Sequence, residues 1–283
     1  MAERTRRVTT VRVVRTERLT PHLIRVVLGG EELAGLPVGG CTDHYVKLIF
    51  PRPQVRYPEP FDLAAVHRDL PREQWPRLRS YTVRAFDPMA RELIIDFVYH
   101  GEHGLAGPWA AAARPGDVIR FLGPGGGYAP DPAADWHLLA GDESALPAIA
   151  AALERLPADA VARVFVEVAD PAEEQKLPAG PDVEIVWLHR NAEPVGAALV
   201  AAVTALDFPP GDVHAFVHGE ADAVRRLRRL LRIDRAVPAD RLSISGYWRR
   251  GVDDEGWRAA KADWNRDAEA EESAALGAAP TSS

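Results

Sequence analysis

The sequence predicts two domains of different fold class, a small antiparallel β-barrel followed by an α/β domain with a parallel sheet. Short segments rich in β-branched residues, joined by turns, fill the first half of the chain. After Pro132, apolar strand-like segments alternate with helix-like ones. The length of 283 residues also fits two domains of about 150 residues each. We predict a barrel over residues 1–130, an α/β domain over 131–250, a C-terminal helix over 251–268 and a disordered tail over 269–283.

The barrel strands are predicted from their β-branched residues and from the turns between them. Pro21 separates the first two, and Pro88-Met89-Ala90 forms a turn between two later ones. The Pro- and Arg-rich stretch from Pro51 to Pro76 is expected to be mostly loop. The predicted strands are residues 8–20, 22–30, 45–50, 81–87, 92–100 and 117–123.

The second domain is predicted from strands that are apolar on both faces, which is typical of a parallel sheet covered on both sides. A Gly- and Pro-rich linker, residues 123–135, precedes it. The predicted strands are residues 136–141, 161–170, 183–189, 213–219 and 242–248, and the predicted helices are 144–156, 195–205 and 221–233, with one more helix from Asp253 or Asp254.

Charge and cysteine content limit the function. The chain has 34 Lys and Arg against 41 Asp and Glu, a formal charge of −7, which argues against a general nucleic-acid or anionic-membrane binder. Cys41 is the only cysteine, so no disulfide within the chain and no multi-cysteine metal or iron–sulfur site can form. We expect no signal peptide, no membrane segment, a cytoplasmic location and a monomer.

A polar segment at the start of a predicted barrel strand could contact a cofactor. Alternation places Arg79 and Tyr81 on one side and Thr82 on the other. Arg79 can pair with a diphosphate, the Tyr81 ring can lie against a flavin, and the Thr82 hydroxyl can reach a flavin ring nitrogen. The alternative to a cofactor contact is an ordinary strand with an exposed arginine and a half-buried tyrosine.

A Gly-rich turn after the strand of residues 92–100 leads into a short helix that has Pro108 in its first turn. We expect unpaired backbone N–H groups from about Leu105 to Trp109, which suit an anion such as a diphosphate. His100 stands just before them and could donate to a phosphate or ribityl oxygen, or lie in a solvated turn. A zinc site at His100 and His103 lacks further ligands, and no metal site is predicted.

Seven segments, in order, closely resemble the siderophore-interacting proteins, the FAD-dependent ferric-siderophore reductases found widely in actinobacteria. The resemblance extends from about Val8 to Trp264. It implies an FAD-binding barrel, an NAD(P)H-type α/β domain of the ferredoxin–NADP reductase kind, and reduction of ferric siderophores in the cytoplasm. The segments are RSYTVRAFD, IDFVYHGEHGLAGPWA, GPGGGYAP, LLAGDESALPAIAAALE, FVEVADPAEEQ, VHGEADAVRRLRRLLR and SGYWRRG.

The resemblance maps flavin contacts onto Arg79, Tyr81, Thr82, His100 and the 107–109 helix start. Asp142, Ser144 and Ala145 match a D-E-T-A segment in which Ser144 keeps the hydroxyl of the usual threonine. Tyr247 and Trp248 end a strand of the α/β sheet, where such domains bind ligands, and could cover the flavin or its adenine. The full set of expected cofactor-binding residues is Arg79, Ser80, Tyr81, Thr82, Asp96, His100, Leu105, Ala106, Gly107, Pro108, Trp109, Asp142, Ser144, Ala145, Tyr247 and Trp248.

The electron donor is less well indicated. The family implies NADH or NADPH, yet the first β–α turn contains no G-x-G-x-x-G and has Asp142 and Glu143 where a diphosphate would require N–H groups and no negative charge. A later strand ends in His218-Gly219-Glu220, where ferredoxin-reductase relatives carry a Cys-Gly pair. A ferredoxin is the alternative donor.

The substrate side follows from metal chemistry. A siderophore holds Fe(III) through hard oxygen ligands, so reduction to the less strongly held Fe(II) releases the iron and no protein ligand to iron is needed. The resemblance implies a basic pocket for the chelate, for which the best matches are Lys47, Arg249 or Arg250, and Lys261. The alternative for each of these residues is that it is a solvated surface charge. This alternative is weakest for Lys47, which lies within an otherwise apolar strand. An FAD-free siderophore-binding protein and the reductase partner of an oxygenase are the competing functions.

Overall fold

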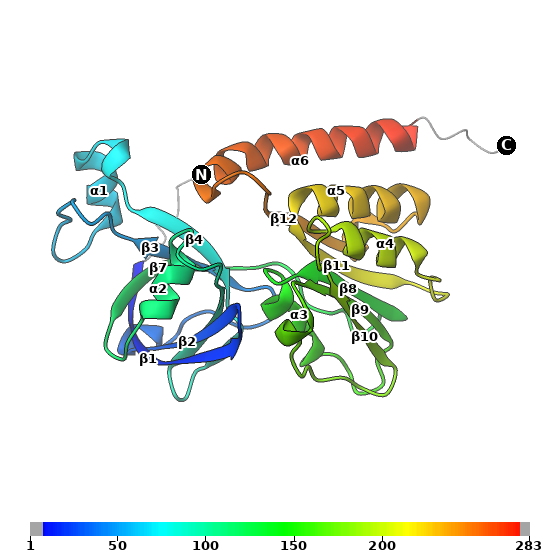
Figure 1. Ribbon diagram of the computed structural model, residues 1–283, viewed down its shortest axis with the longest axis horizontal. Helices are drawn as coiled ribbons and strands as arrows, with labels where there is room; N and C mark the ends of the chain where they lie inside the picture. The colour runs from blue at the N-terminus through cyan, green and yellow to red at the C-terminus, as the bar shows by residue number, and fades with distance from the viewer. Residues whose placement is uncertain (1–7, 278–283) are drawn as a thin grey trace. The chain divides into compact units, whose positions relative to one another are not determined.

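The computed structural model describes residues 8–277, and the chain divides into two compact units, Met1–Gly127 and Tyr128–Ser283. Figure 1 shows that the first is built mainly from strands and the second from a sheet with helices. The predicted fold class, an antiparallel barrel and a parallel α/β domain, is confirmed.

The first unit contains one seven-stranded sheet in the order β4-β3-β7-β1-β2-β6-β5. All the pairings within it are antiparallel. A continuous core of buried aliphatic and aromatic side chains lies inside it, including Leu28, Leu48, Ile95 and Phe121. The strands are β1 (Val8–Thr20), β2 (Leu23–Gly29), β3 (Tyr45–Phe50), β4 (Arg77–Thr82), β5 (Ala85–Asp87), β6 (Glu92–Val98) and β7 (Val118–Gly125), and the short helices are η1 (Glu31–Leu33), α1 (Leu63–Asp69), η2 (Arg72–Gln74) and α2 (Ala106–Ala112).

One predicted barrel strand is wrong. Residues 81–87 do not form a single strand but are divided between β4 and β5, at opposite edges of the sheet. The chain changes partner at the break, because Val83 N–H donates to His44 O and Arg84 N–H donates to Ile94 O. The polar segment Arg79–Thr82 therefore ends a strand instead of starting one.

The excursion between β3 and β4 is more ordered than a simple loop. Asp62 caps α1 by accepting from Ala64 N–H at 2.9 Å. Arg52 Nε donates to Trp75 O at 2.9 Å, and Tyr57 Oη donates to Gln74 O at 2.9 Å. These contacts fold the Pro-rich stretch back on itself.

The second unit has a five-stranded parallel sheet in the order β10-β9-β8-β11-β12. Both faces are covered, which explains why β8 is buried along its whole length. Its strands are β8 (Trp136–Asp142), β9 (Ala162–Val168), β10 (Val183–His189), β11 (Val213–Glu220) and β12 (Leu242–Trp248), and its helices are α3 (Leu146–Leu153), η3 (Pro171–Glu173), α4 (Ala197–Ala205), α5 (Ala221–Arg229), η4 (Leu230–Asp234, a π-helix), η5 (Ala239–Arg241) and α6 (Asp254–Gly277).

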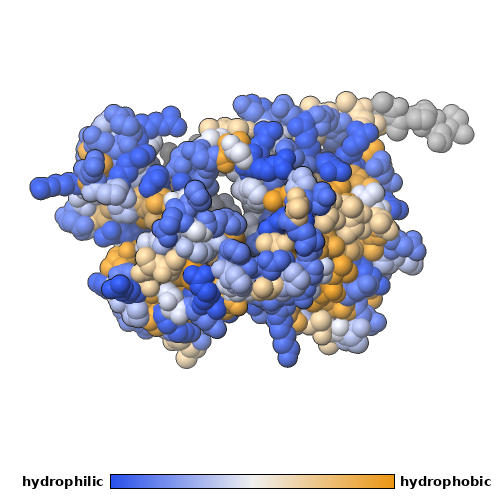
Figure 2. All heavy atoms as spheres, in the orientation of Figure 1, coloured by the Kyte–Doolittle hydropathy of each residue, from blue (hydrophilic) through white to orange (hydrophobic). Residues whose placement is uncertain are grey.

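The prediction that regular structure ends at residue 268 is wrong for residues 269–277, which continue α6. Alanine and glutamate favour helix, and ion pairs hold this last part to the preceding helices. Glu271 binds Arg225, while Glu272 accepts from Arg228 Nε at 2.8 Å and Arg232 Nε at 2.6 Å. Figure 2 shows hydrophilic residues, in blue, over α5 and α6, mixed with mildly hydrophobic ones near the end of α6. Residues 278–283 of the predicted tail lie outside the described residues.

Candidate functional site

The polar residues of β4 lie on an edge strand, whose ladder partner among the described strands is β3. Arg79 pairs with Leu48 and Tyr81 with Val46, so both share a face with buried core residues. Ser80 and Thr82 lie on the other face, as the alternation predicted. Arg79 and Tyr81 are half-buried, Ser80 is exposed and Thr82 is buried.

An aromatic cluster connects two of the predicted contacts. The Tyr81 ring lies 4.4 Å from the Phe97 ring, and the Phe97 ring lies 5.6 Å from Trp109 of α2. The Trp109 ring also contacts Phe50 edge-on at 5.9 Å. The structure thus brings Tyr81 and Trp109 together through Phe97, which the sequence reasoning did not single out. In the sequence, Phe97 is marked only as an apolar residue of a predicted strand.

The start of α2 provides fewer unpaired N–H groups than predicted. Trp109 N–H donates to Leu105 O at 3.2 Å, so it does not point outward unpaired. Gly107 is required for packing, since a Cβ there would lie 2.9 Å from Val98 O. Ala106 is buried in the barrel core, Leu105 and Pro108 are half-buried, and His100 is exposed.

Asp96 is committed to the barrel itself. Arg25 on the neighbouring strand donates to both of its carboxylate oxygens, through Nε at 2.7 Å and Nη2 at 2.8 Å. The two residues face each other in the β2–β6 ladder, and the Asp96 carboxylate is buried. Both carboxylate oxygens of Asp96 are therefore paired within the barrel, and this bidentate pair explains the buried charge without a cofactor contact.

Lys47, the expected substrate contact in the barrel, pairs with Ser80 in the β3–β4 ladder. It therefore shares a face with Ser80 and Thr82, not with Arg79 and Tyr81. The Lys47 side chain is half-buried.

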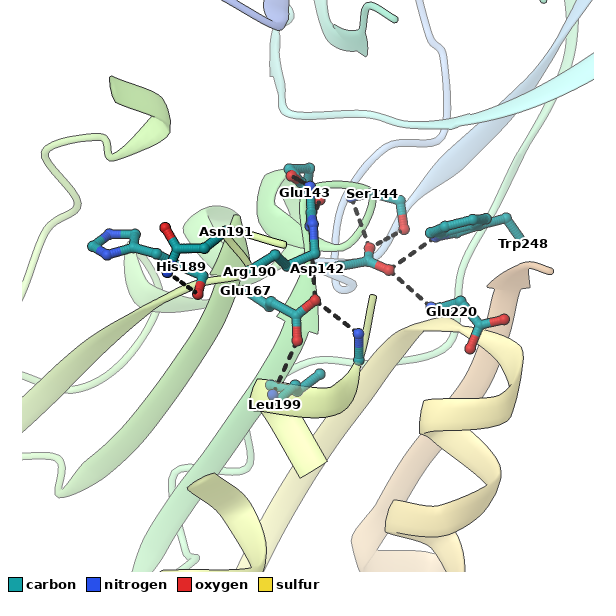
Figure 3. A network of polar contacts seen from close by, with 11 residues as sticks. Asp142, Glu143, Ser144, Glu167, His189, Arg190, Asn191, Leu199, Glu220 and Trp248 are labelled. Carbon is teal, nitrogen blue, oxygen red and sulfur yellow. Dashed lines mark hydrogen bonds and ion pairs between the residues drawn. The ribbon is translucent and has the colours of Figure 1, made fainter. Parts of the chain in front are cut away.

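The second unit places Asp142, Ser144 and Trp248 in one polar network at the carboxyl ends of its strands (Figure 3). Asp142 Oδ1 accepts from Ser144 N–H at 2.9 Å and from Ser144 Oγ at 2.5 Å. Asp142 Oδ2 accepts from Trp248 Nε1 at 2.8 Å and from Glu220 N–H at 2.8 Å. Burial, with the nearby charge of Glu143, raises the pKa of Asp142 to about 6.

Two further carboxylates at this edge were not among the predicted site residues. Glu167 is the penultimate residue of β9 and is fully buried. Arg190 donates to Glu143 and lies 3.8 Å from Glu167. Glu220 ends β11 and accepts from backbone N–H groups at the start of α5. An acidic residue directly before a predicted helix was the available signal for Glu220. Nothing in the sequence marked Glu167 beyond its place in an apolar strand.

The other predicted contacts in this unit have different surroundings. Ala145 is buried in the α/β core, whereas Tyr247 is half-buried and contacts the ring of His218 edge-on at 4.8 Å. His218 is buried and stacks on Phe216 at 3.9 Å. Burial, with a smaller contribution from the positive charge of Lys261, lowers the pKa of His218 to about 3.

Three of the predicted substrate-pocket residues belong to the second unit. Arg249 lies 3.7 Å from Asp222, and Arg250 N–H donates to Glu220 Oε1 at 3.2 Å. Lys261 lies on α6 between Trp257 and Trp264, whose buried rings contact each other at 5.6 Å. The four-residue and three-residue spacings place all three on one side of the helix, which brings Lys261 to its packed side.

The β4 segment has the chemistry that FAD requires. FAD combines an anionic diphosphate, a polyol and a flat aromatic ring system. Along β4 stand a guanidinium, two hydroxyls and an aromatic ring within four consecutive residues, Arg79–Thr82. The residues present therefore fit the cofactor.

The described residues 8–277 contain no group of three or more His, Cys, Asp or Glu side chains arranged to hold a metal ion. Within the same range, every helix is too short or too polar to cross a bilayer.

Comparisons with known families match most of the chain. Residues 12–128 match the siderophore-interacting FAD-binding domain, and residues 134–251 match the siderophore-interacting protein domain. The two matches correspond to the two compact units.

Individual proteins agree with the family matches. An uncharacterized protein of Mycobacterium tuberculosis is 51% identical over 260 residues, covering 87% of this chain and 92% of the relative. The ferric vibriobactin reductase ViuB of Vibrio cholerae is 36% identical over 249 residues, covering 86% and 90%. The NADPH-dependent ferric-chelate reductase of Escherichia coli is 33% identical over 241 residues, covering 83% and 91%.

A solved structure has the same architecture. A siderophore utilization protein from T. fusca superposes with a TM-score of 0.75 at 42% identity, covering 87% of this chain and 94% of that one. The fold, both domain matches and these relatives lead to one conclusion: the chain belongs to the siderophore-interacting protein family.

Proposed function

We propose that the protein is an FAD-dependent ferric-siderophore reductase that acts in the cytoplasm and releases iron as Fe(II). The observation that carries the proposal is the β4 segment Arg79–Thr82, which presents a cation, hydroxyls and an aromatic ring on one edge strand of a matched FAD-binding domain. The names of the Vibrio and Escherichia relatives support ferric chelates as the substrate class.

In this proposal, each residue of the β4 segment has a distinct part. Arg79 pairs with the diphosphate through a charge-assisted contact. Tyr81, held against Phe97, presents its ring to the isoalloxazine, and Thr82 donates its hydroxyl to a ring nitrogen. His100 and the start of α2 add polar contacts to the phosphate or ribityl groups. When bound, FAD supplies the ability to accept electrons as a hydride and to pass them on one at a time.

The chain's part on the substrate side is attraction and orientation. Reduction lowers the affinity of hard oxygen ligands for iron, so the protein does not have to bind the metal itself. Lys47 in the barrel, and Arg249, Arg250 and Lys261 in the second unit, supply positive charge for an anionic chelate. Because Lys47 shares a face with Ser80 and Thr82, its charge acts on the hydroxyl side of β4.

Electrons come, in this proposal, from NADH or NADPH, and the name of the Escherichia coli relative supports NADPH. The first β–α turn, with Asp142 and Glu143, argues against binding of the donor in the usual dinucleotide manner.

The test is anaerobic and uses the purified full-length protein. Its flavin content is read from absorbance near about 450 nm, and Fe(II) release from a ferric siderophore is followed with a coloured Fe(II) chelator. We expect bound FAD and Fe(II) formation that requires both the protein and a reductant.

The competing functions give different results. Tight binding of the ferric siderophore by a colourless, flavin-free protein would identify a binding protein instead. Flavin reduction without Fe(II) release, together with electron delivery to an oxygenase, would identify an oxygenase reductase.

A further inference from the structure

Parallel α/β sheets usually bind dinucleotides at the carboxyl ends of their strands. In the order β10-β9-β8-β11-β12, the connection after β8 leads to β9 on one side, and the connection after β11 leads to β12 on the other side. The gap between the carboxyl ends of β8 and β11 is therefore the topological switch point, where a diphosphate normally lies.

In this protein a carboxylate of the chain itself occupies that gap. Asp142, at the end of β8, accepts from the backbone N–H of Glu220 at the end of β11, at 2.8 Å. Its remaining contacts go to Ser144 and Trp248, and the residue is only 2% exposed (Figure 3). A diphosphate entering here would lose these N–H donors and meet a negative charge.

Carboxylates of the chain also accept from the backbone N–H groups at the N-termini of α4 and α5. Glu167 accepts from Gly196 N–H at 2.7 Å and Leu199 N–H at 3.0 Å at the start of α4. Glu220 accepts from Asp222 N–H at 2.8 Å and Ala223 N–H at 3.0 Å at the start of α5. The N–H groups that bind phosphates in other α/β folds are thus paired with internal carboxylates.

The glycines at this edge serve the same internal packing. Gly219 has φ +142°, and a Cβ on it would lie 2.7 Å from Asp142 Oδ2. Gly141 is equally restricted, because its Cβ would lie 2.6 Å from His218 O. The two glycines allow close internal packing, of Gly219 against Asp142 and of Gly141 against His218, and neither provides space for a phosphate.

We propose that this protein recognises its hydride donor through the dihydronicotinamide end alone, because Asp142, Glu167 and Glu220 exclude the diphosphate from the sheet edge. The proposal rests on the reductase function proposed above. One dihydronicotinamide loses a hydride and becomes the pyridinium cation, its two electrons reduce two Fe(III) to two Fe(II), and one proton is released. NADH, NADPH and reduced nicotinamide mononucleotide should then be nearly equivalent donors.

The first test is direct binding to the flavin-loaded protein. Isothermal titration with ADP-ribose and with 2′-phospho-ADP-ribose should show no binding up to about millimolar concentration. A Kd below about 100 µM for either fragment would overturn the proposal.

The second test compares donors under anaerobic conditions. The kcat/KM values for NADH, NADPH and reduced nicotinamide mononucleotide should agree within about threefold. A preference of more than about tenfold for either dinucleotide, or no flavin reduction by any of the three, would overturn it. Protein reduced with dithionite is then mixed with the ferric siderophore. Fe(II) release in that assay would support the reductase function even if the donor proposal fails. The absence of Fe(II) release would refute the reductase function itself.

A variant tests whether the carboxylates are responsible. Glu220→Gln keeps an oxygen that can accept from Asp222 and Ala223 but removes the charge, so it should bind ADP-ribose with a Kd below about 1 mM, a concentration at which wild type shows no binding. Glu184→Gln, on β10 near the amino edge of the same sheet, is the matched control and should behave as wild type. Equal ADP-ribose binding by all three proteins would show that the charge of Glu220 does not exclude the diphosphate.

Discussion

The two units differ in how they satisfy the groups that could bind an anion. In the α/β unit, Asp142, Glu167 and Glu220 pair with backbone N–H groups at the carboxyl edge of the sheet. In the barrel, the cation and hydroxyls of Arg79–Thr82 lie along an edge strand, and the internal carboxylate Asp96 is paired elsewhere with Arg25. A fold that usually binds dinucleotides therefore does not guarantee a dinucleotide site, because the chain's own side chains can occupy it.

A fall in pH should reveal the largest difference between the two units, because it lowers the stability of the α/β unit. His218 and His137 are buried in the α/β unit, and burial lowers the pKa of His218 to about 3 and of His137 to about 4. Below pH 6.5 the unfolded chain takes up protons that the folded unit does not bind. The stability that neutral histidine contributes is therefore present above pH 6.5 and is lost as the pH falls.

For His218 alone we expect a loss of about 3 kcal/mol in unfolding free energy between pH 6.5 and pH 4. Urea unfolding of wild type and His218→Phe across this range measures it. The variant keeps an aromatic ring beside Phe216 and should show a flatter pH profile. Parallel profiles for the two proteins would contradict the assignment.

Arg79→Ala tests the barrel side of the comparison. Loss of a charge-assisted contact to phosphate should weaken FAD binding about 10- to 100-fold. Fluorescence titration of apoprotein with FAD measures this, with Arg91→Ala at the β5–β6 turn as the matched control. Unchanged FAD affinity in Arg79→Ala would remove Arg79 from the site.

Lys47→Ala tests whether the charge on β3 serves the substrate. We expect KM for an anionic ferric catecholate to rise about three- to tenfold, and KM for a neutral ferric hydroxamate to change little, with flavin content unchanged. The wild-type preference should shrink with added salt, because the Debye length falls from about 10 Å at 0.1 M to about 3 Å at 1 M. Lys176→Ala, an exposed lysine of the other unit, is the control. Equal losses for both chelates, or loss of FAD, would mean that Lys47 serves the barrel.

Thr82→Ala should have the smallest effect. The hydroxyl is proposed to touch the redox ring and not the phosphates, so FAD should stay bound while its reduction potential shifts by about 20 mV, equivalent to one neutral hydrogen bond. Spectroelectrochemical titration of Thr82→Ala and Thr82→Ser measures the shift. A potential unchanged in the alanine variant would place the hydroxyl away from the ring.

Much of this architecture could be predicted because its signals are local. Turn residues and β-branched runs located most strands, and the alternation in Arg79–Thr82 gave the correct faces of β4. The division between β4 and β5 was missed because it depends on the partner exchange at Val83 and Arg84, which involves residues distant in sequence. The last turns of α6 were missed because their Arg–Glu pairs with α5 and η4 are likewise non-local.

The candidate site shows the same limit. Asp142, Ser144 and Trp248 were each singled out, but their hydrogen bonding to one another was not predicted. Glu167 was missed because its role depends on Gly196, 29 residues away. Residue types can be read from a sequence, but their pairing requires the fold.

The most direct test of the proposed reductase function is an anaerobic electron count. The flavin-loaded protein is reduced with one equivalent of dithionite, excess reductant is removed, and a ferric siderophore is added while the flavin band near about 450 nm and a coloured Fe(II) chelator are followed together. We predict about two Fe(II) released per flavin, with return of the oxidised flavin band in step with iron release. A flavin that stays reduced while no Fe(II) is formed would contradict the account.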